Sequence, residues 1–406
     1  MQIFFSVGEP SGDLHAANLL RQLRERTRLT ARGLGGPKLR AAGCELLRDM
    51  SDLALMGLFP VLAKLPQFWS LLSHVEQSLD NHRPDAVVLI DYPGFNWHVA
   101  RMAKQRRIPV FYYGLPQIWA WASWRVHKVQ RFVDHALCKL PFEKDWLQAH
   151  GCRATYVGHP YFDELNEQLL DESFQTSLRL RGGRVVTLLP GSRTQEVKLN
   201  LPLLLKAAAH VRRECPDVRL AIASYNDRQA ELARELVAAG PVPADVFVGR
   251  TPELIEAAEC CLACSGSVSL ELLYHAKPAV IVYRVGWLTY SLFRPLINVR
   301  YITLVNLLAS PQPLRDRRIE APRVAGASAE EQVPYPEYPT WQDCSSQVAQ
   351  HAIDWLSDEH CRQESIRQLM NLRERFATAG ASATAAEYIV RALHGATPDD
   401  IRRQAA

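Results

Sequence analysis

The sequence opens with Met1-Gln-Ile-Phe-Phe-Ser-Val7, and Gly8-Glu-Pro-Ser-Gly-Asp13 follows directly. The first stretch is short and apolar, as a buried strand is, and the second supplies the glycines that a tight turn requires. The next segment, Leu14–Arg26, has the apolar periodicity of an amphipathic helix. Strand, turn and helix in this order form the unit from which parallel α/β sheets are built. The opening residues therefore predict an α/β fold.

The same unit recurs in two series along the chain. Strands of the first series are expected at Ile3–Val7, Ala86–Ile90, Val110–Tyr113 and Ala136–Leu140, and those of the second at Val185–Leu189, Leu220–Ser224, Val246–Val248, Cys261–Cys264 and Ala279–Tyr283. Further helices are expected at Asn96–Arg106, Leu201–Glu214, Val268–His275, Ser345–Trp355, Arg362–Thr378 and Ala383–Leu393. A chain of 406 residues is long enough for two such domains, and two domains imply a cleft between them.

The two series set the expected domain boundaries. We expect a first domain over residues 1–165 and a second over 180–375, with a polar linker at 161–183. Residues 310–340, rich in Pro, Arg and Glu, are typical of a loop insertion rather than a core element. The last helix, within 380–406, is placed to cross back onto the first domain.

Composition excludes several classes of protein. Lys and Arg number 47 against 43 Asp and Glu, a net charge of +4 that tolerates anionic ligands but is not typical of a nucleic-acid binder. The first strand lacks the basic flank of a signal peptide, and nine scattered cysteines indicate reduced thiols in the cytosol. Cys261 and Cys264 form a lone C-x-x-C in an apolar setting, which favours a buried strand over a metal site.

The turn Gly8–Asp13 is the first candidate site. Free amides at the start of a helix face an anion or a sugar hydroxyl in many α/β proteins. The turn is not G-x-G-x-x-G, so a dinucleotide site is not indicated. A tight strand-to-helix turn, with Ser11 and Asp13 as helix caps, is the alternative.

Leu189-Pro-Gly-Ser-Arg-Thr-Gln-Glu196 holds the same position in the second domain and adds an arginine. A guanidinium stays charged at every relevant pH and binds a diphosphate with two hydrogen bonds. Arg193 also follows a glycine turn at the carboxyl end of a strand, where α/β sheets bind ligands. It is therefore a candidate for stabilising a departing nucleotide diphosphate, with a solvated surface arginine as the alternative.

Ser265-Gly-Ser-Val-Ser-Leu-Glu271 follows another predicted strand and opens a helix. Ser265, Gly266 and Ser267 would offer backbone amides to a phosphate. Glu271 would then accept hydrogen bonds from a ribose diol, unless it is an ordinary solvated helix residue.

Asp91 ends an apolar strand of the first domain, in Ile90-Asp-Tyr-Pro-Gly-Phe-Asn96. A carboxylate at that edge would remove a proton from an acceptor hydroxyl, and a turn or helix-cap aspartate is the alternative. Two aromatic residues in Pro116-Gln-Ile-Trp-Ala-Trp121 would stack on a sugar or fill the core. The chain contains no D-x-D, so the usual carboxylates for a metal on a nucleotide diphosphate are missing. No metal and no cofactor are expected.

The stretch Leu53–Leu72 is unusually apolar. It is interrupted by Pro60, Lys64, Pro66 and Gln67, so it does not form an uninterrupted membrane span of about 20 residues. An apolar face for the membrane surface would consist of Phe59, Leu62, Leu65, Phe68, Trp69 and Leu72. A helix pair packed into the core of the first domain is the alternative.

In order along the chain, these segments closely resemble the lipid-A-disaccharide synthase family. The matching segments are Gly8–Asp13, Gly35-Gly-Pro37, Met56-Gly57, Ile90–Pro93, Phe95-Asn96, Trp119-Ala-Trp121, Leu140-Pro-Phe-Glu143, Gly158-His159, Leu189–Arg193, Ser265–Ser267, Leu270-Glu271 and Asn306-Leu-Leu-Ala309. The resemblance implies the GT-B fold, in which two Rossmann-like parallel-sheet domains face a cleft. It also implies inverting transfer of 2,3-diacylglucosamine from its UDP derivative to the 6-hydroxyl of 2,3-diacylglucosamine 1-phosphate, giving a β-1,6 disaccharide and UDP.

The resemblance also implies roles for individual residues and partners. Asp91 matches the candidate general base and Arg193 the phosphate-binding arginine, and the other matching positions bind substrate. These positions are Glu9 and Ser11 in the acceptor-side loop, and Ser192, Ser265, Gly266, Ser267, Glu271 and Asn306 around the donor nucleotide. The implied partners are a UDP-sugar donor, an acylated glucosamine phosphate acceptor and the cytoplasmic face of the inner membrane, with a homodimer left open.

The chain also departs from the family pattern. Gly94 replaces a common acidic residue, and Val305 and Ser310 replace a proline and a glycine. The expected run on to Pro-Glu-Leu and a glutamine is broken by Pro311–Gln332, and Val333–Tyr338 resembles a displaced remnant of it. Two alternatives therefore stay open. One is another GT-B enzyme, such as a UDP-N-acetylglucosamine 2-epimerase, and the other is an inactive nucleotide-sugar-binding protein.

Overall fold

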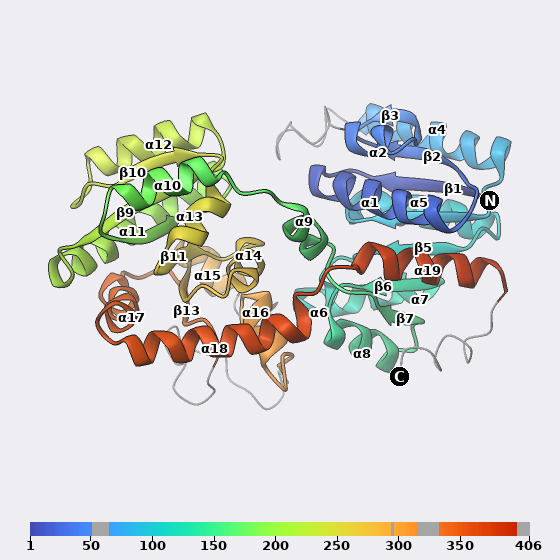
Figure 1. The fold of residues 1–406 in the computed structure, drawn as a ribbon. Coiled ribbons are helices and arrows are strands. Elements are labelled where there is room, and N and C mark those ends of the chain that lie inside the picture. Colours follow the sequence, from blue (N-terminus) through green and yellow to red (C-terminus); the bar gives the residue numbers. More distant parts are fainter. Residues whose placement is uncertain (51–64, 294–295, 316–332, 396–406) are drawn as a thin grey trace. The chain divides into compact units, whose positions relative to one another are not determined.

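The computed structural model describes residues 1–50, 65–293, 296–315 and 333–395. The chain forms two compact units (Figure 1). The first comprises Met1–Asp163 together with Ala379–Ala406, and the second comprises Glu164–Thr378. The chain therefore leaves the first unit once and returns to it for its final helix.

The first unit is built on a seven-stranded parallel sheet. Its strands are β1 (Gln2–Val7), β2 (Thr30–Gly35), β3 (Glu45–Asp49), β4 (Ala86–Ile90), β5 (Val110–Tyr113), β6 (His135–Cys138) and β7 (Ala154–Tyr156), in the spatial order β3-β2-β1-β4-β5-β6-β7. Strand β1 lies between β2 and β4, so that Ile3 pairs with Ala31 on one side and Ala86 on the other. The strand order therefore reverses direction at β1 and β4.

Helices cover both faces of this sheet. They are α1 (Pro10–Arg26), α2 (Pro37–Ala41), α4 (Leu65–His82), α5 (Pro93–Gln105), α6 (Ile118–Trp121), α7 (Val126–Phe132), α8 (Pro141–Ala149) and α19 (Ala381–Leu393), with a 3-10 turn η2 at Ser123–Arg125. Helix α9 (Tyr161–Glu167) contains the boundary between the two units. Helices α1, α2, α5 and α8 each begin with proline, whose fixed φ suits the first helical position. The proline thus ends each strand-to-helix turn abruptly.

The core of the first unit lies on both sides of its sheet. Residues of α4, α5 and α7 pack on one face, and residues of α1 and α19 pack on the other. On the second face, Ala385, Ala386 and Ile389 of α19 are fully buried. The small side chains of Ala385 and Ala386 let α19 lie close to α1, so the final helix completes the core of the first unit.

The second unit has a six-stranded parallel sheet. Its strands are β8 (Arg184–Leu189), β9 (Val218–Ser224), β10 (Asp245–Val248), β11 (Cys260–Cys264), β12 (Ala279–Arg284) and β13 (Glu337–Thr340), in the order β10-β9-β8-β11-β12-β13. Its helices are α10 (Glu172–Leu180), α11 (Thr194–Glu214), α12 (Asp227–Ala238), α13 (Thr251–Ala257), α14 (Val268–Tyr274), α15 (Trp287–Phe293), α16 (Leu304–Ala309), α17 (Ser345–Ser357) and α18 (Glu359–Phe376). The prediction of two parallel-sheet α/β domains is confirmed.

Two expected irregular segments contain regular structure. The stretch expected as a linker, 161–183, holds α9 and α10. In the stretch expected as a loop insertion, 310–340, residues 316–332 lie outside the described ones, but Glu337–Thr340 is strand β13 and Tyr335 is fully buried. The interpretation of residues 310–340 as a loop rather than a core element is therefore wrong for Glu337–Thr340, which pairs with β12.

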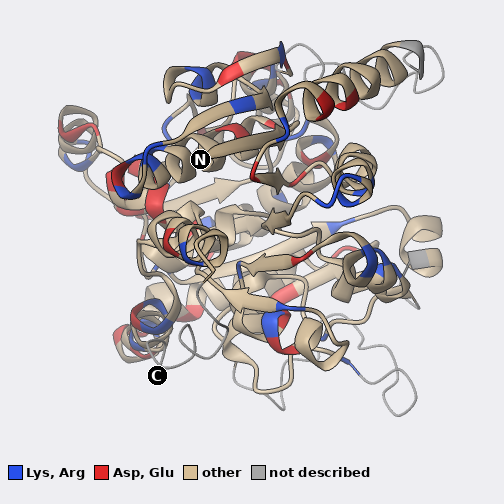
Figure 2. Cartoon of the chain, turned by 90° about the vertical axis from the view of Figure 1, so that its right-hand side faces the viewer, with Lys and Arg blue, Asp and Glu red and all other residues tan. Residues whose placement is uncertain are grey.

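Charged residues of both signs are spread over the chain. Figure 2 shows Lys and Arg positions interspersed with Asp and Glu positions on the helices of the view. Many of them form pairs within one element or between neighbours, such as Arg184 with Asp217 and Arg106 with Asp80. The chemistry of each unit therefore depends on local groups rather than on a uniformly charged face.

Candidate active site

Each sheet has one point at which its strand order reverses. In the first unit this point lies between β1 and β4, and in the second between β8 and β11. Ligands of open α/β sheets bind outside the carboxyl ends of the strands at such points, because the flanking loops turn away in opposite directions. The motifs singled out above follow these four strands.

The loop after β4 is strained. Asp91 and Tyr92 have φ values of 46° and 41°, a left-handed conformation that residues other than glycine seldom adopt. The carbonyl oxygen of Asp91 accepts hydrogen bonds from Oη of Tyr112 at 2.7 Å and Nδ2 of Asn96 at 2.8 Å. Such strain persists only where the surroundings hold it, and it is concentrated at functional sites.

Asn96, on α5, fastens the ends of the two central strands together. Its side chain is fully buried, accepts a hydrogen bond from Oγ of Ser6 at 2.6 Å and donates to the carbonyl oxygens of Ser6 and Ile90, each at 3.2 Å. Ser6 belongs to β1 and Ile90 to β4. The position of Asp91 is therefore set by the two strands on either side of the switch point.

The carboxylate of Asp91 is half-buried and has a cationic neighbour. Nζ of Lys139, at the end of β6, lies 3.4 Å from Oδ1 of Asp91. Gly114, at the end of the intervening strand, has a φ of 69°, and a Cβ there would lie 3.0 Å from Nζ of Lys139. Oδ2 of Asp91 lies 3.5 Å from where a Cβ on Gly12 would be, so it faces the loop after β1. Lys139 was missed by the sequence reasoning.

The loop after β1 lies against the loop after β4. A Cβ on Gly8 would lie 2.3 Å from the ring of Tyr92, so only glycine fits there. Glu9 and Ser11 are exposed at the start of α1. These two predicted acceptor-side residues thus lie at the start of the helix whose Gly12 is next to Asp91.

Asp13 has a structural role in the same motif. Its buried carboxylate accepts hydrogen bonds from the backbone amides of Gly36 at 2.7 Å, Lys38 at 2.9 Å and Leu39 at 3.1 Å. These amides begin α2 and have no partner within that helix. Asp13 therefore caps α2 rather than contacting a ligand.

The two aromatic residues of α6 differ. Trp119 is buried and its Nε1 donates to Oε1 of Glu143 at 3.2 Å. Burial raises the pKa of Glu143, although the charge of Lys139 and the hydrogen bond from Trp119 act in the opposite direction. Trp121 is 46% exposed, with the guanidinium of Arg125 at 4.8 Å from its ring centroid. Trp119 therefore belongs to the core, and Trp121 is the exposed aromatic of the pair.

In the second unit, the loop after β8 presents Arg193. Its side chain is 81% exposed, and its guanidinium lies 3.2 Å from Oε1 of Glu196. Oε2 of Glu196 accepts hydrogen bonds from the amides of Ser192 at 3.0 Å and Arg193 at 3.1 Å. Gly191, with a φ of 117°, leaves room for this carboxylate. Glu196 thus occupies the place at the start of α11 where an anion would bind.

Asn200, one turn further along α11, is the counterpart of Asn96. Its buried Nδ2 donates to the carbonyl oxygen of Glu196 at 2.9 Å, and it lies 3.5 Å from the carbonyl oxygen of Pro190 and 3.1 Å from Sγ of Cys264. Its Oδ1 accepts from the amide of Arg284 at 2.8 Å. One side chain therefore ties together the ends of β8, β11 and β12.

The serine-rich loop after β11 lies beside the Arg193 loop. Gly266 and Ser267 are exposed, and Oγ of Ser265 donates to the carbonyl oxygen of Ile302 at 3.4 Å. Glu271, in the first turn of α14, is buried. The alternative of a solvated helix residue is therefore wrong for Glu271.

Asn306 is fully buried on α16 and organises the segment that precedes β13. Its amide group exchanges two hydrogen bonds with the backbone of Tyr335, at 2.7 and 3.0 Å, and donates to Oε2 of Glu337 at 3.1 Å. Glu337 also accepts from the amides of Ile302 and Thr303. Burial raises the pKa of Glu337 to about 7, with these hydrogen bonds acting in the opposite direction. The sequence reasoning named Asn306 but did not assign Glu337 to the site.

The lone C-x-x-C lies in β11. Cys261 and Cys264 are both buried, and burial raises the pKa of each thiol to about 12. Both side chains are therefore neutral thiols. Within the described residues, no group of three or more His, Cys, Asp and Glu side chains is placed to hold a metal ion.

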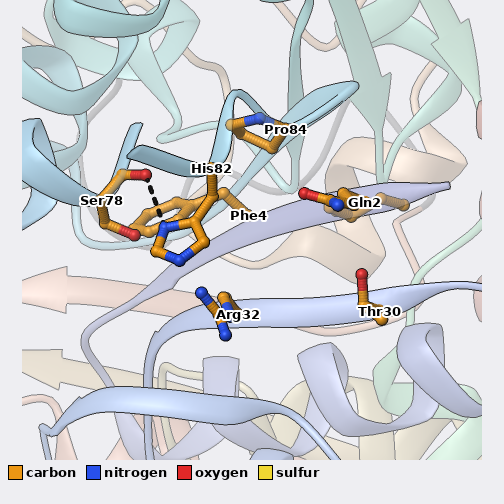
Figure 3. A pocket seen from close by; sticks show the side chains of 8 residues that line it. Gln2, Phe4, Thr30, Arg32, Ser78, His82 and Pro84 are labelled. Atoms are coloured by element: carbon orange, nitrogen blue, oxygen red, sulfur yellow. Dashed lines mark hydrogen bonds between the residues drawn. The ribbon is translucent and has the colours of Figure 1, made fainter. Parts of the chain in front are cut away.

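A small cavity lies at the other end of the first sheet. Figure 3 shows it between the starts of β1 and β2, at Gln2 and Thr30, and the end of α4, where Nδ1 of His82 lies 3.1 Å from the carbonyl oxygen of Ser78. Its volume of about 10 Å³ suits one water molecule. It is therefore unrelated to the loops at the carboxyl ends of the strands.

The apolar stretch 53–72 lies partly outside the described residues. This applies to Phe59 and Leu62 and to the side chain of Leu65. Within α4, Leu72 is buried in the core and Phe68 packs edge-on against Phe95, with 5.3 Å between ring centroids. Trp69 is 59% exposed. The described helices include none that is long and apolar enough to span a bilayer.

Comparison with known proteins shows the family and the fold of the chain. The family described as lipid-A-disaccharide synthetase matches residues 3–317. The lipid-A-disaccharide synthase of Anaeromyxobacter dehalogenans (strain 2CP-C) is 39% identical over 312 residues, which cover 76% of this chain and 81% of that protein. That of Myxococcus xanthus (strain DK1622) is 33% identical and covers 97% of both chains. A UDP-GlcNAc 2-epimerase from Neisseria meningitidis bound to UDP-GlcNAc has a similar fold, with a TM-score of 0.60, 10% identity and coverage of 97% and 99%.

The family match extends over most of the chain, and both relatives are more than 30% identical to it. The chain therefore belongs to the lipid-A-disaccharide synthase family and is a glycosyltransferase of lipid A biosynthesis with the GT-B fold.

Proposed function

We propose that this enzyme transfers 2,3-diacylglucosamine from UDP-2,3-diacylglucosamine to the 6-hydroxyl of 2,3-diacylglucosamine 1-phosphate, with inversion at the anomeric carbon. The observation that carries the proposal is the placement of Asp91 and Arg193 at the switch points of their sheets. A carboxylate suits the acceptor hydroxyl, and a guanidinium suits the leaving diphosphate.

The first unit supplies the acceptor chemistry in this proposal. Asp91 takes the proton from the attacking hydroxyl, and its strained, doubly hydrogen-bonded backbone keeps the carboxylate in place before the acceptor arrives. Lys139, 3.4 Å from Asp91, supplies a positive charge for the acceptor phosphate. Glu9 and Ser11 line the same loop, where their polar groups bind sugar hydroxyls.

The second unit binds the donor in this proposal. Arg193 and the amide of Ser192 bind the diphosphate once Glu196 gives up its place, and the exposed amides of Gly266 and Ser267, next to Ser265, lie on the neighbouring loop. Glu271, buried behind that loop, accepts from the ribose. Asn306 acts as a positioning residue, because its amide group is hydrogen-bonded to Tyr335 and Glu337. The diphosphate charge is met without a metal.

The test is turnover of UDP-diacylglucosamine with the monosaccharide 1-phosphate acceptor, followed as UDP release and disaccharide formation. Asp91→Asn should lose at least a hundredfold in kcat while UDP affinity stays within twofold, since general-base catalysis contributes about 10²–10⁴-fold and acts on the acceptor. A parallel loss of UDP affinity would make Asp91 a binding or structural residue. Addition of EDTA should leave the rate unchanged.

A second candidate function is epimerisation of a UDP-sugar, favoured only by the similar fold of the Neisseria meningitidis epimerase. Both enzymes would bind a UDP-sugar on the second unit, so binding alone does not separate them. Product analysis does, because the transferase yields UDP and a disaccharide, whereas the epimerase yields an epimeric UDP-sugar and releases no UDP. Formation of an epimeric UDP-sugar without acceptor consumption would reject the transferase.

The acceptor is a lipid, so we place the enzyme on the cytoplasmic face of the inner membrane through exposed apolar side chains of the first unit. Trp69 is the described candidate, because Phe68 is held against Phe95. Trp69→Ser should weaken binding to anionic vesicles and raise the KM for the acceptor. Trp124, also 59% exposed, is the matched control. Equal losses for Trp69→Ser and Trp124→Ser would contradict this placement.

A further inference from the structure

The second unit carries a group of exposed apolar side chains that the proposed function has not used. On α15, Trp287 is 60% exposed, Leu288 70% and Leu292 62%. Leu288 and Leu292 are four residues apart and therefore lie along one stripe of the helix. Monomeric proteins seldom gather large apolar side chains on one exposed helix without a ligand or partner to cover them.

This group, Trp287, Leu288 and Leu292, is connected to the Arg193 loop through the end of β12. The end of β12 is fastened to α11, because the amide of Arg284 donates to Oδ1 of Asn200 at 2.8 Å. Helix α15 begins three residues later, so its first Cα lies within about 10 Å of that of Arg284. The apolar helix is thus tethered beside the diphosphate site.

Two more exposed aromatic side chains lie near the end of β12. Tyr283, next to Arg284 on β12, is 38% exposed. Trp341, 39% exposed, follows Thr340, which pairs with Arg284 and accepts a hydrogen bond from the amide of Val285 at 3.0 Å. Exposed apolar side chains therefore occur at the end of β12, on the segment after β13 and on α15.

From this connection we infer that α15 binds the acyl chains of the donor. The inference rests on the proposed function, because it assigns the diphosphate of that donor to Arg193. A ligand with a charged diphosphate and apolar chains needs a cationic loop and an apolar surface within one molecular length, and the second unit offers both. Each methylene group removed from water strengthens binding by about fourfold, so contact with a few of them suffices to discriminate acylated from unacylated donors.

The test compares ligands on the full-length chain with Trp287, Leu288 and Leu292 each replaced by Ser. We expect affinity for UDP-diacylglucosamine to fall at least tenfold, while affinities for UDP and UDP-N-acetylglucosamine stay within twofold. Leu180→Ser, an 82% exposed leucine on α10 of the same unit, should change none of the three. An unchanged affinity for the acylated donor, or an equal loss for UDP, would overturn the inference.

Three further measurements keep the result unambiguous. If the triple variant has a lower Tm, Leu288→Ser alone should still weaken the acylated donor by about threefold, close to the effect of one methylene contact. Reduced binding to anionic vesicles with unchanged donor affinity would assign α15 to the bilayer and reject the donor role. If the wild-type enzyme binds the acylated donor but forms no disaccharide, the proposed function fails while the acyl site stands.

Discussion

The loop after β4 and the loop after β8 are held by the same kind of hydrogen-bonded asparagine, but their candidate functional side chains differ in burial and backbone strain. In each, a buried asparagine on the following helix, Asn96 or Asn200, binds the ends of the central strands. Asp91 is then held in a strained backbone with its carboxylate half-buried beside Lys139. The guanidinium of Arg193 is instead exposed to solvent.

The difference lies in what occupies each loop before a ligand arrives. The start of α11 already holds an anion, because Glu196 accepts from two backbone amides and pairs with Arg193. Under the proposed function, a diphosphate has to displace this carboxylate, whereas an acceptor meets an Asp91 whose backbone is already fixed by hydrogen bonds. The geometry of the first loop is therefore set by folding, and that of the second loop would be completed by ligand binding.

The largest effect is expected from the exposed cation. Arg193→Ala should reduce kcat/KM by roughly 10²–10³-fold, about 3 kcal/mol or more, because it removes the charge that stabilises the leaving diphosphate. The Tm should change little, since the side chain is 81% exposed. Arg213→Ala, further along α11 and paired with Glu214, is the control. Near-normal turnover would remove Arg193 from the diphosphate site.

The two units should respond to pH in opposite directions. Burial lowers the pKa of His135 in the first unit to about 4 from 6.5, and raises that of Glu337 in the second to about 7 from 4.5. The contribution of His135 to the free energy of unfolding is therefore complete above pH 6.5 and is lost as the pH falls towards 4. The contribution of Glu337 to the free energy of unfolding is complete below pH 4.5 and is lost as the pH rises to 7. Each change is of the order of 3 kcal/mol.

Hydrogen exchange resolved by segment measures this contrast. Amides of β6 and α19 should lose protection on acidification, because His135 bonds to Tyr388. Amides around α16 and β13 should lose protection between pH 4.5 and 7. Glu337→Gln should abolish the pH dependence of protection around α16 and β13 and leave that of β6 and α19 unchanged. Parallel slopes in both units would show that these two groups do not control local stability.

Replacement of either asparagine should lower stability by a similar amount, but the two replacements should impair different steps of the reaction. Asn96→Leu and Asn200→Leu should each lower the free energy of unfolding by about 2 kcal/mol, because each leaves several buried polar groups without partners. Asn96→Leu should also lower kcat, since it releases Asp91. Asn200→Leu should instead raise the Kd for UDP. Urea unfolding and calorimetric titration of both variants measure this, and identical functional defects would mean that the two loops do not differ.

The smallest effect should be a gain. Glu196→Gln removes the charge that competes with the diphosphate while keeping a side-chain oxygen for the amides. UDP should then bind about fivefold more tightly, or about 1 kcal/mol. Glu214→Gln at the other end of α11 should change nothing. Weaker binding of UDP to Glu196→Gln would show that Glu196 orients Arg193 rather than competing with the ligand.

The fold was predictable where the pattern was regular. The central strands, such as β4 and β11, are continuous apolar runs, because strands of a parallel sheet are buried on both faces. Strands β2, β3, β7 and β13 were missed. Strand β13 contains Pro339, which a sheet tolerates at an edge, where no neighbour needs its missing amide hydrogen. Such a segment has no apolar run to reveal it.

The candidate site was predictable only as far as single motifs go. Asp91 ends an apolar run before Pro93, and Arg193 follows the glycine turn after another apolar run, which are local signals. Lys139 lies 48 residues after Asp91 in the sequence. The two side chains come together because β4, β5 and β6 are neighbours in the sheet and Gly114 leaves space beside Lys139. No local pattern contains that information. Glu196 did carry a signal, since a glutamate three residues after a helix start is typical of a capping box.

The return of the chain to its first unit has a consequence for biosynthesis. Asp163 ends the first segment of that unit, and its carboxylate accepts hydrogen bonds from the amides of Gly380, Ala381 and Ser382, where the second segment begins. Helix α19 then covers α1. During translation the second unit emerges complete before the first can bury that face. The nascent first unit must therefore wait, with its α1 surface uncovered, while the second unit is synthesised and folds.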